Sequence, residues 1–392
     1  MRTHRTSVAV LLLAVGGFVA IGLPEGTLGV AWPAIRATFD QPLSGLGIVL
    51  GVSTAGYLGA SLGAGALSGR IGVGWLLTAA AATGSAGLLA CATAPTWAGL
   101  IGGSLFVGLA GGVFDAAINA YVALRHGVRW LGLLHAAFGV GATAAPLALA
   151  ALFEHGWTWR WAYLAVLVVE VVLLAGFAAT RRAWSTAEAD ETAETDEADE
   201  QPPRVPGQAT ALVLLSVITF FVYVGIEATA GQWSFSLLTE DRGLSAGTAG
   251  VWVGSYWANL TAGRLLTGAL GDRLRPVRVL DASMAGMAVG GALVWYSPTP
   301  SVAGFGFAIL GFSAAAVFPT MIALTPARIG RDRAAAIIGY QVAAAALGGA
   351  VVPGFTGVLA EAVGLAVVGP VLVASVAILL ILHRVSCRLA AR

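Results

Sequence analysis

Hydrophobic stretches of about 20 residues, each long enough to cross the roughly 30 Å hydrocarbon core of a bilayer, recur along this chain from end to end. A water-soluble domain of 392 residues needs a charged surface, but 58% of these residues are hydrophobic and only 10% are charged. The sequence therefore predicts an all-α integral membrane protein whose partner is the lipid bilayer. A net charge of +1 does not favour nucleic acid as a partner.

Twelve stretches are predicted to be transmembrane helices. They are residues 6–35, 43–67, 74–92, 97–124, 131–153, 159–179, 209–238, 246–270, 277–295, 302–324, 334–359 and 365–383. We interpret the first as a membrane helix and not as a cleaved signal, because no small-x-small cleavage site follows it.

The segment between the sixth and seventh stretches has a different composition. Residues 185–209 carry a run of Glu and Asp, followed by Pro202, Pro203 and Pro206. Such a segment cannot bury enough apolar surface to fold by itself, so we expect a disordered linker. It separates an N-terminal six-helix half, residues 1–184, from a C-terminal six-helix half, residues 210–392.

The arginines predict the orientation of these helices. All 21 basic residues are arginine, and most of them lie at the two termini, in the linker and in one set of alternate loops. The opposite loops hold Arg36, Arg160 and Arg242. Because cytoplasmic loops are enriched in basic residues, both termini and the linker are predicted to be cytoplasmic.

A short phrase occurs twice, after the second and the eighth stretch. The copies are Gly65-Ala66-Leu67-Ser68-Gly69-Arg70 and Gly268-Ala269-Leu270-Gly271-Asp272-Arg273. In each we expect small residues to flank a tight turn at the cytoplasmic surface. Two duplicated membrane-embedded halves are typical of secondary transporters, which bind their solute where the halves meet.

This repeated phrase resembles the loop signature of the major facilitator superfamily. The resemblance implies a fold of two pseudo-symmetric six-helix halves, in which the first, fourth, seventh and tenth helices line a central cavity. It also implies a gating role for Arg70, Asp272 and Arg273. The first copy departs from the signature, because Gly69 stands where the signature has Asp.

Further stretches along the chain carry a second, narrower similarity. They are 111–119 with Asp115 and Asn119, 133–141 with His135 and Phe138, 223–227 (Tyr-Val-Gly-Ile-Glu), 318–320 (Phe-Pro-Thr), and 348–357 with its glycines and Pro353. In this order they resemble the fucose:proton symporter (fucose permease) family. The resemblance implies coupled transport of a sugar.

Two carboxylates in the predicted spans are candidates for proton coupling. A charged group in a bilayer is costly unless it is paired, solvated or neutralised. Asp115 has Asn119 one turn away on the same helix face, and we expect it to bind and release the coupling proton. Glu25 follows Gly22-Leu23-Pro24, which we expect to break the first helix and expose carbonyl groups. The alternative for both is a packing role.

Sugar sites combine aromatic rings, amides and carboxylates. On this ground and on the family resemblance, the predicted substrate-binding residues are Asn119, His135, Phe138, Glu227, Gln232, Trp233, Asn259 and Gln341. Helix packing is the alternative for each. Arg264 shares a stretch with Asn259, and we expect its side chain to extend towards the cytoplasmic surface.

Together these features predict a monomeric transporter of the cytoplasmic membrane, not an enzyme. It would move a small polar solute, with a monosaccharide favoured, by proton-coupled alternating access and without a cofactor; Na⁺ is the alternative coupling ion. No phosphate-binding glycine loop indicates ATP hydrolysis. Alternatives are efflux of amphipathic compounds, a non-transporting receptor with the same fold, and an intramembrane enzyme, for which His135 with Asp115 is the nearest constellation.

Overall fold

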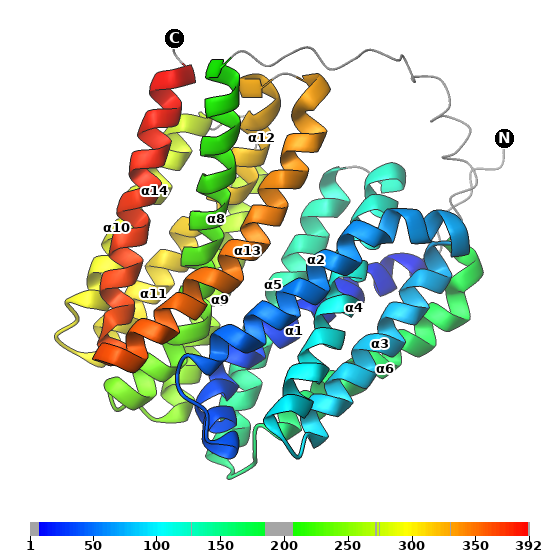
Figure 1. Ribbon diagram of the computed structural model, residues 1–392, viewed down its shortest axis with the longest axis horizontal. Coiled ribbons are helices and arrows are strands. Elements are labelled where there is room, and N and C mark those ends of the chain that lie inside the picture. The colour runs from blue at the N-terminus through cyan, green and yellow to red at the C-terminus, as the bar shows by residue number, and fades with distance from the viewer. Residues whose placement is uncertain are drawn as a thin grey trace. The chain divides into compact units, whose positions relative to one another are not determined.

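The computed structural model describes residues 8–126, 128–184, 207–270, 273, 275–329 and 331–390, which are helical apart from short turns (Figure 1). The α-helices are α1 Val8–Phe39, α2 Gly45–Ile71, α3 Val73–Thr93, α4 Trp97–His126, α5 Val128–Glu154, α6 Arg160–Thr180, α8 Gly207–Ser236, α9 Ala246–Leu270, α10 Pro276–Trp295, α11 Pro300–Ala314, α12 Val317–Ile329, α13 Arg331–Val363 and α14 Val368–Ala390. Short 3₁₀ helices at Arg181–Ala183 and Leu365–Val367 and a π-helical turn at Leu237–Asp241 extend some of them.

Eleven of the twelve predicted membrane helices are confirmed. Eleven helical segments of the described chain are long and apolar enough to cross a membrane, with α11 and α12 forming one of them. The twelfth is α9, which has 25 residues and is less apolar, with Asn259 and Arg264 within it. Which end of the bundle faces the cytoplasm stays a prediction.

One predicted helix is interrupted in the structure. The stretch 302–324 is interrupted by a turn at Ala315 and Ala316, between α11 and α12. Pro319 lies three residues after Ala316. Its nitrogen carries no hydrogen and cannot donate the helical hydrogen bond to the carbonyl of Ala315. The break therefore precedes the proline by one turn.

By their contacts, the residues of the chain form two compact units, and each is described by itself. Unit 1 comprises Met1–Pro24, Val52–Gly141 and Arg160–Arg204, and unit 2 comprises Glu25–Gly51, Ala142–Trp159 and Val205–Arg392. These bounds differ from the halves at 1–184 and 210–392, which remain a prediction from the sequence. Most of the predicted linker, residues 185–206, lies outside the described residues.

The core of unit 1 is built around α3, which packs against α4 and α6. Aromatic rings fill its interior: the rings of Phe114 and Phe177 lie 5.6 Å apart, and Trp184 lies 5.6 Å from Phe177 and 4.8 Å from Tyr121. This packing holds α4 firmly, and α4 carries Asp115.

The core of unit 2 is built around α8, which packs against α13 and α14, while α9 packs against α11. Figure 1 shows the beginning of α8 beside the end of α14. The final part of α1 also joins this unit. A Cβ atom on Gly29 would lie 2.8 Å from the Gln232 Cα atom, so only glycine lets α1 approach the α8 backbone this closely.

Candidate solute and proton sites

The carboxylate of Asp115 lies well inside α4 and is held by two neutral donors. Tyr57 of α2 donates its hydroxyl to Asp115 Oδ2 at 2.5 Å, and Asn119 donates Nδ2 to Asp115 Oδ1 at 2.9 Å. No ion pair to Asp115 occurs among the described residues. The structure thus brings Asp115 and Asn119 together as their spacing predicts, and it adds Tyr57.

The other candidates of unit 1, His135 and Phe138, lie on α5. His135 is an exposed residue of α5, and its ring meets the ring of Phe18 edge-on, with 5.5 Å between centroids. Phe138 is partly buried and packs against the core of unit 1. The guanidinium of Arg125 lies 5.3 Å from the ring centre of Tyr121.

Glu227 of α8 forms the centre of a denser polar cluster in unit 2. Tyr223 directs its hydroxyl at Glu227 Oε2, 2.5 Å away, and at the carbonyl of Ala314, 2.9 Å away. Arg264 of α9 donates Nη2 to Glu227 Oε1 and Oε2, at 3.0 and 3.1 Å. Tyr256, also on α9, donates its hydroxyl to the backbone carbonyl of Glu227 at 2.8 Å. The cluster therefore joins α8, α9 and α11.

The expectation that Arg264 extends towards the membrane surface is wrong. Its guanidinium is paired with Glu227 between two helices, where its side chain keeps 21% of its exposure and that of Glu227 keeps 12%. The opposite charge lies within reach, so a guanidinium held in a poorly solvated interior gains more from the ion pair than from an extended conformation.

Glu25 also belongs to unit 2. The amide nitrogen of Gln232 donates to Glu25 Oε1 at 3.0 Å and to the Glu25 backbone carbonyl at 3.3 Å. The expected helix break at Gly22-Leu23-Pro24 is absent: α1 is helical from Val8 to Phe39. Proline removes one donor only, and transmembrane helices tolerate that loss.

Trp233 and Asn259 each donate a side-chain hydrogen bond to a backbone carbonyl of the protein. The indole of Trp233 is fully buried, and its Nε1 donates to the carbonyl of Pro353 at 2.9 Å. Asn259 donates Nδ2 to the carbonyl of Ser255 on its own helix at 2.9 Å. Binding roles for both remain predictions.

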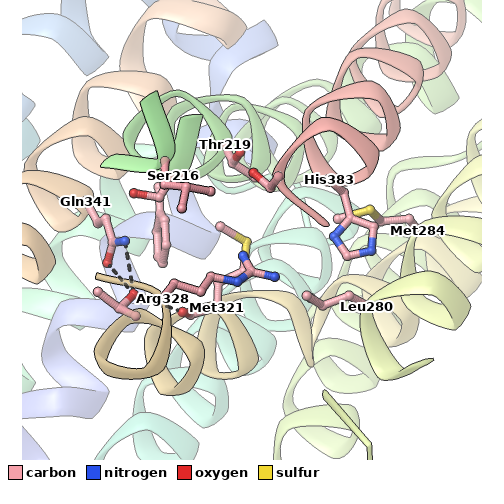
Figure 2. A pocket seen from close by; sticks show the side chains of 12 residues that line it. Ser216, Thr219, Leu280, Met284, Met321, Arg328, Gln341 and His383 are labelled. Carbon is pink, nitrogen blue, oxygen red and sulfur yellow. Dashed lines mark hydrogen bonds between the residues drawn. The ribbon is translucent and has the colours of Figure 1, made fainter. Parts of the chain in front are cut away.

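Gln341 lines a small pocket near the start of α8 and the end of α14 (Figure 2). Its Nε2 donates to Thr325 Oγ1 at 3.1 Å, and Figure 2 shows the side chain of Arg328 lying between Gln341 and His383. His383 in turn lies 3.1 Å from Asp281 Oδ1. The space open to the centre of a water molecule is about 20 Å³, which is room for about one water molecule and not for a sugar.

The repeated glycine–arginine phrase is only partly described. In the first copy, Arg70 is exposed and still helical, and the chain turns at Gly72, whose φ of 82° is the left-handed region that favours glycine. The expected turn within the phrase is therefore displaced beyond the end of α2. In the second copy, Arg273 is exposed, and Asp272 lies outside the described residues.

Sequence reasoning missed four members of the two clusters: Tyr57, Tyr223, Tyr256 and Arg264. Tyr223 could have been found, because it lies four residues before Glu227 on the same helix face. The others reach their carboxylate or backbone partners from a neighbouring helix. No local pattern in the sequence points to that contact.

The fold and these clusters define a class: a multi-pass α-helical membrane protein with carboxylates held inside its helices. A family model described as Major Facilitator Superfamily matches residues 13–229 and 215–386, which together cover most of the chain. The chain therefore belongs to the major facilitator superfamily. It is a transporter and not an enzyme.

Two curated proteins are similar over most of the chain. Bypass of stop codon protein 6 of Saccharomyces cerevisiae is 25% identical over 385 residues, covering 89% of this chain and 76% of the yeast protein. Sodium-dependent glucose transporter 1A of Mus musculus is 24% identical over 389 residues, covering 87% of each protein.

Solved structures are similar in fold at low sequence identity. The nucleoside transporter NupG (D323A mutant) has a TM-score of 0.75 at 14% identity, covering 97% of this chain and 99% of its own. A D-xylose-proton symporter has a TM-score of 0.73 at 15% identity, covering 95% of this chain and 97% of its own. FucP in the outward conformation has a TM-score of 0.63 at 15% identity, covering 97% of this chain and 99% of its own. The predicted resemblance to fucose permease is thus confirmed at the level of the fold.

Proposed function

We propose that this transporter moves a small polar solute, a sugar or a close chemical relative of one, by proton-coupled alternating access. Asp115 carries the coupling proton, and Glu25 is a second carboxylate that can bind one. The protein lies in the cytoplasmic membrane with both termini in the cytoplasm, works as a monomer and requires no cofactor.

The observation that carries this proposal is the set of partners around Asp115. An ionised carboxylate inside a membrane protein costs several kcal/mol unless it is compensated, and the partners that Asp115 has in the structure, Tyr57 and Asn119, are neutral. Binding a proton removes that cost. Asn119 Oδ1 is buried and accepts no hydrogen bond from the described residues, so it offers an acceptor to a protonated Asp115.

A sugar as the solute is supported by the polar groups and by two relatives. Carboxylates and amides such as Glu25 and Gln232 bind hydroxyl groups with defined geometry. The mouse relative is named a sodium-dependent glucose transporter, and one similar structure is a D-xylose-proton symporter. The name of the mouse protein also makes Na⁺ the alternative coupling ion to be tested.

The test is uptake of labelled monosaccharides and sugar acids into proteoliposomes under an imposed pH gradient. Accumulation that a protonophore abolishes is expected. Asp115→Asn should abolish gradient-driven accumulation but preserve exchange of labelled for unlabelled solute, because the amide keeps the hydrogen-bonding shape and cannot carry the proton. Unchanged proton-driven accumulation in Asp115→Asn would overturn the assignment of Asp115.

The same vesicles separate the rival functions. Accumulation driven by a Na⁺ gradient and insensitive to the protonophore would replace H⁺ by Na⁺ as the coupling ion. Extrusion of hydrophobic dyes without accumulation of any sugar or sugar acid would indicate efflux of amphipathic compounds. No movement of either class of solute would favour a receptor.

A further inference from the structure

The ion pair between Arg264 and Glu227 uses only one nitrogen of the Arg264 guanidinium. Both hydrogen bonds to the Glu227 carboxylate, at 3.0 and 3.1 Å, come from Nη2, and neither Nη1 nor Nε donates to Glu227. A guanidinium presents its N–H groups as a planar fork that matches a carboxylate through two nitrogens. The strongest binding geometry of Arg264 is therefore not used by its internal partner.

Both side chains of the pair also keep part of their exposure. The side chains of Arg264 and Glu227 keep 21% and 12% of their exposure, so neither is sealed in the protein. An ion pair in a poorly solvated site recovers little of the desolvation cost of its two charges. An incoming acid that engages the fork through two oxygens can compete with Glu227 for Arg264.

Displacement would leave the Glu227 carboxylate without its cation. The titratable groups around it are Tyr223 on its own helix, Tyr256 and Arg264 on α9, and Glu25 on α1. Once Arg264 binds another anion, Glu25 remains as a negative neighbour. A proton on Glu227 then restores the balance of charge.

We propose that Arg264 binds the acid group of the transported solute, and that the substrate class is a small polyhydroxylated carboxylate, such as an aldonate or uronate. This inference rests on the proposed transport function and deepens it. Binding consumes one anion and one proton: an O–H bond forms on Glu227, the ion pair to Arg264 passes to the solute, and no bond of the solute breaks.

Isothermal titration of the purified full-length protein tests the proposal without depending on transport. D-gluconate and D-galacturonate are the probes, D-glucose is the neutral control, and two buffers of different ionisation enthalpy report the protons taken up. At least one acid should bind about tenfold or more tighter than glucose, because a hydrogen-bonded charge pair contributes that much or more. Binding should take up a proton.

Variants assign the roles. Arg264→Gln should weaken binding of the acid at least tenfold, and Arg264→Lys should restore only part of it because lysine lacks the fork. Glu227→Gln should bind the acid without the proton that Glu227 takes up. The double variant Glu227→Gln/Arg264→Gln is neutral at this position, so its loss of acid binding would not reflect an unpaired charge.

Several results would overturn the inference. One is glucose binding as tightly as both acids; another is no measurable binding of either acid; a third is acid binding unaffected in the double variant. Failure of the proposed function looks different, since it is the absence of gradient-driven accumulation in proteoliposomes. Neutral sugar that accumulates while neither acid binds would leave the transport function intact and remove Arg264 as an acid-binding residue.

Discussion

Unit 1 holds Asp115 and unit 2 holds Glu227 inside its helices, and these two carboxylates are stabilised in different ways. Both lie 2.5 Å from a tyrosine hydroxyl, Tyr57 for Asp115 and Tyr223 for Glu227. Among the described residues, the hydrogen-bond donors to Asp115 are neutral, whereas Glu227 is paired with Arg264. The neutral partners underlie our proposal that Asp115 gains and loses a proton, and the ion pair underlies our proposal that Glu227 exchanges its partner.

The largest effect on stability is expected at the ion pair. Arg264→Gln leaves Glu227 without its cation and should lower the free energy of unfolding by about 3 kcal/mol, the lower end for breaking a buried pair, because the pair keeps some solvent exposure. Thermal unfolding in detergent measures the loss. Glu227→Gln/Arg264→Gln should recover most of it, and Asp115→Asn should lose about 1 kcal/mol or less. Equal losses in Arg264→Gln and Asp115→Asn would remove the distinction between the units.

A smaller effect is expected from the two tyrosines. Tyr57→Phe removes one of the two hydrogen bonds that Asp115 accepts from the described residues, which costs about 1.5 kcal/mol. Tyr223→Phe should cost less, because Arg264 still binds both oxygens of Glu227. Unfolding measurements on the matched pair decide the order, and a larger loss in Tyr223→Phe would contradict it.

A still smaller difference in stability is expected between the alanine variants of two amides, Asn119 and Asn259. Asn119→Ala removes a hydrogen bond to Asp115 and should destabilise the protein by about 1 kcal/mol. Asn259 donates only to the backbone of its own helix, so Asn259→Ala should change stability by about 0.5 kcal/mol or less. Initial rates of uptake should fall in Asn119→Ala more than in Asn259→Ala. The reverse order would indicate that Asn119 has a packing role alone.

The smallest effect is expected at a more exposed ion pair of unit 2. Arg36 binds Glu240, and both side chains keep more than a quarter of their exposure, 29% and 28%. Arg36→Ala should therefore cost about 0–1 kcal/mol, and high salt should reduce the cost further. Unfolding at low and high salt provides the measurement. A loss as large as that of Arg264→Gln would show that burial does not distinguish the two pairs.

Much of the fold could be predicted because membrane helices are a local property of the sequence. Apolar length indicates each helix, and Pro319 shows why the tenth is interrupted one turn earlier. The pair of Asp115 and Asn119 was predictable for the same reason, since residues four apart share a helix face. The ion pair of Arg264 was not predictable, because whether an arginine reaches the surface or an internal carboxylate depends on the neighbouring helix.

By itself, the sequence determined that the chain forms membrane helices and that carboxylates lie inside them, because hydropathy and helical spacing act over a few residues. Only the tertiary structure decided which partners those carboxylates have: Tyr57 from α2 for Asp115, and Arg264 from α9 for Glu227. The physical reason is that a hydrogen bond or ion pair between helices depends on their separation and rotation. Packing along the whole interface sets both, as at Gly29 against α8.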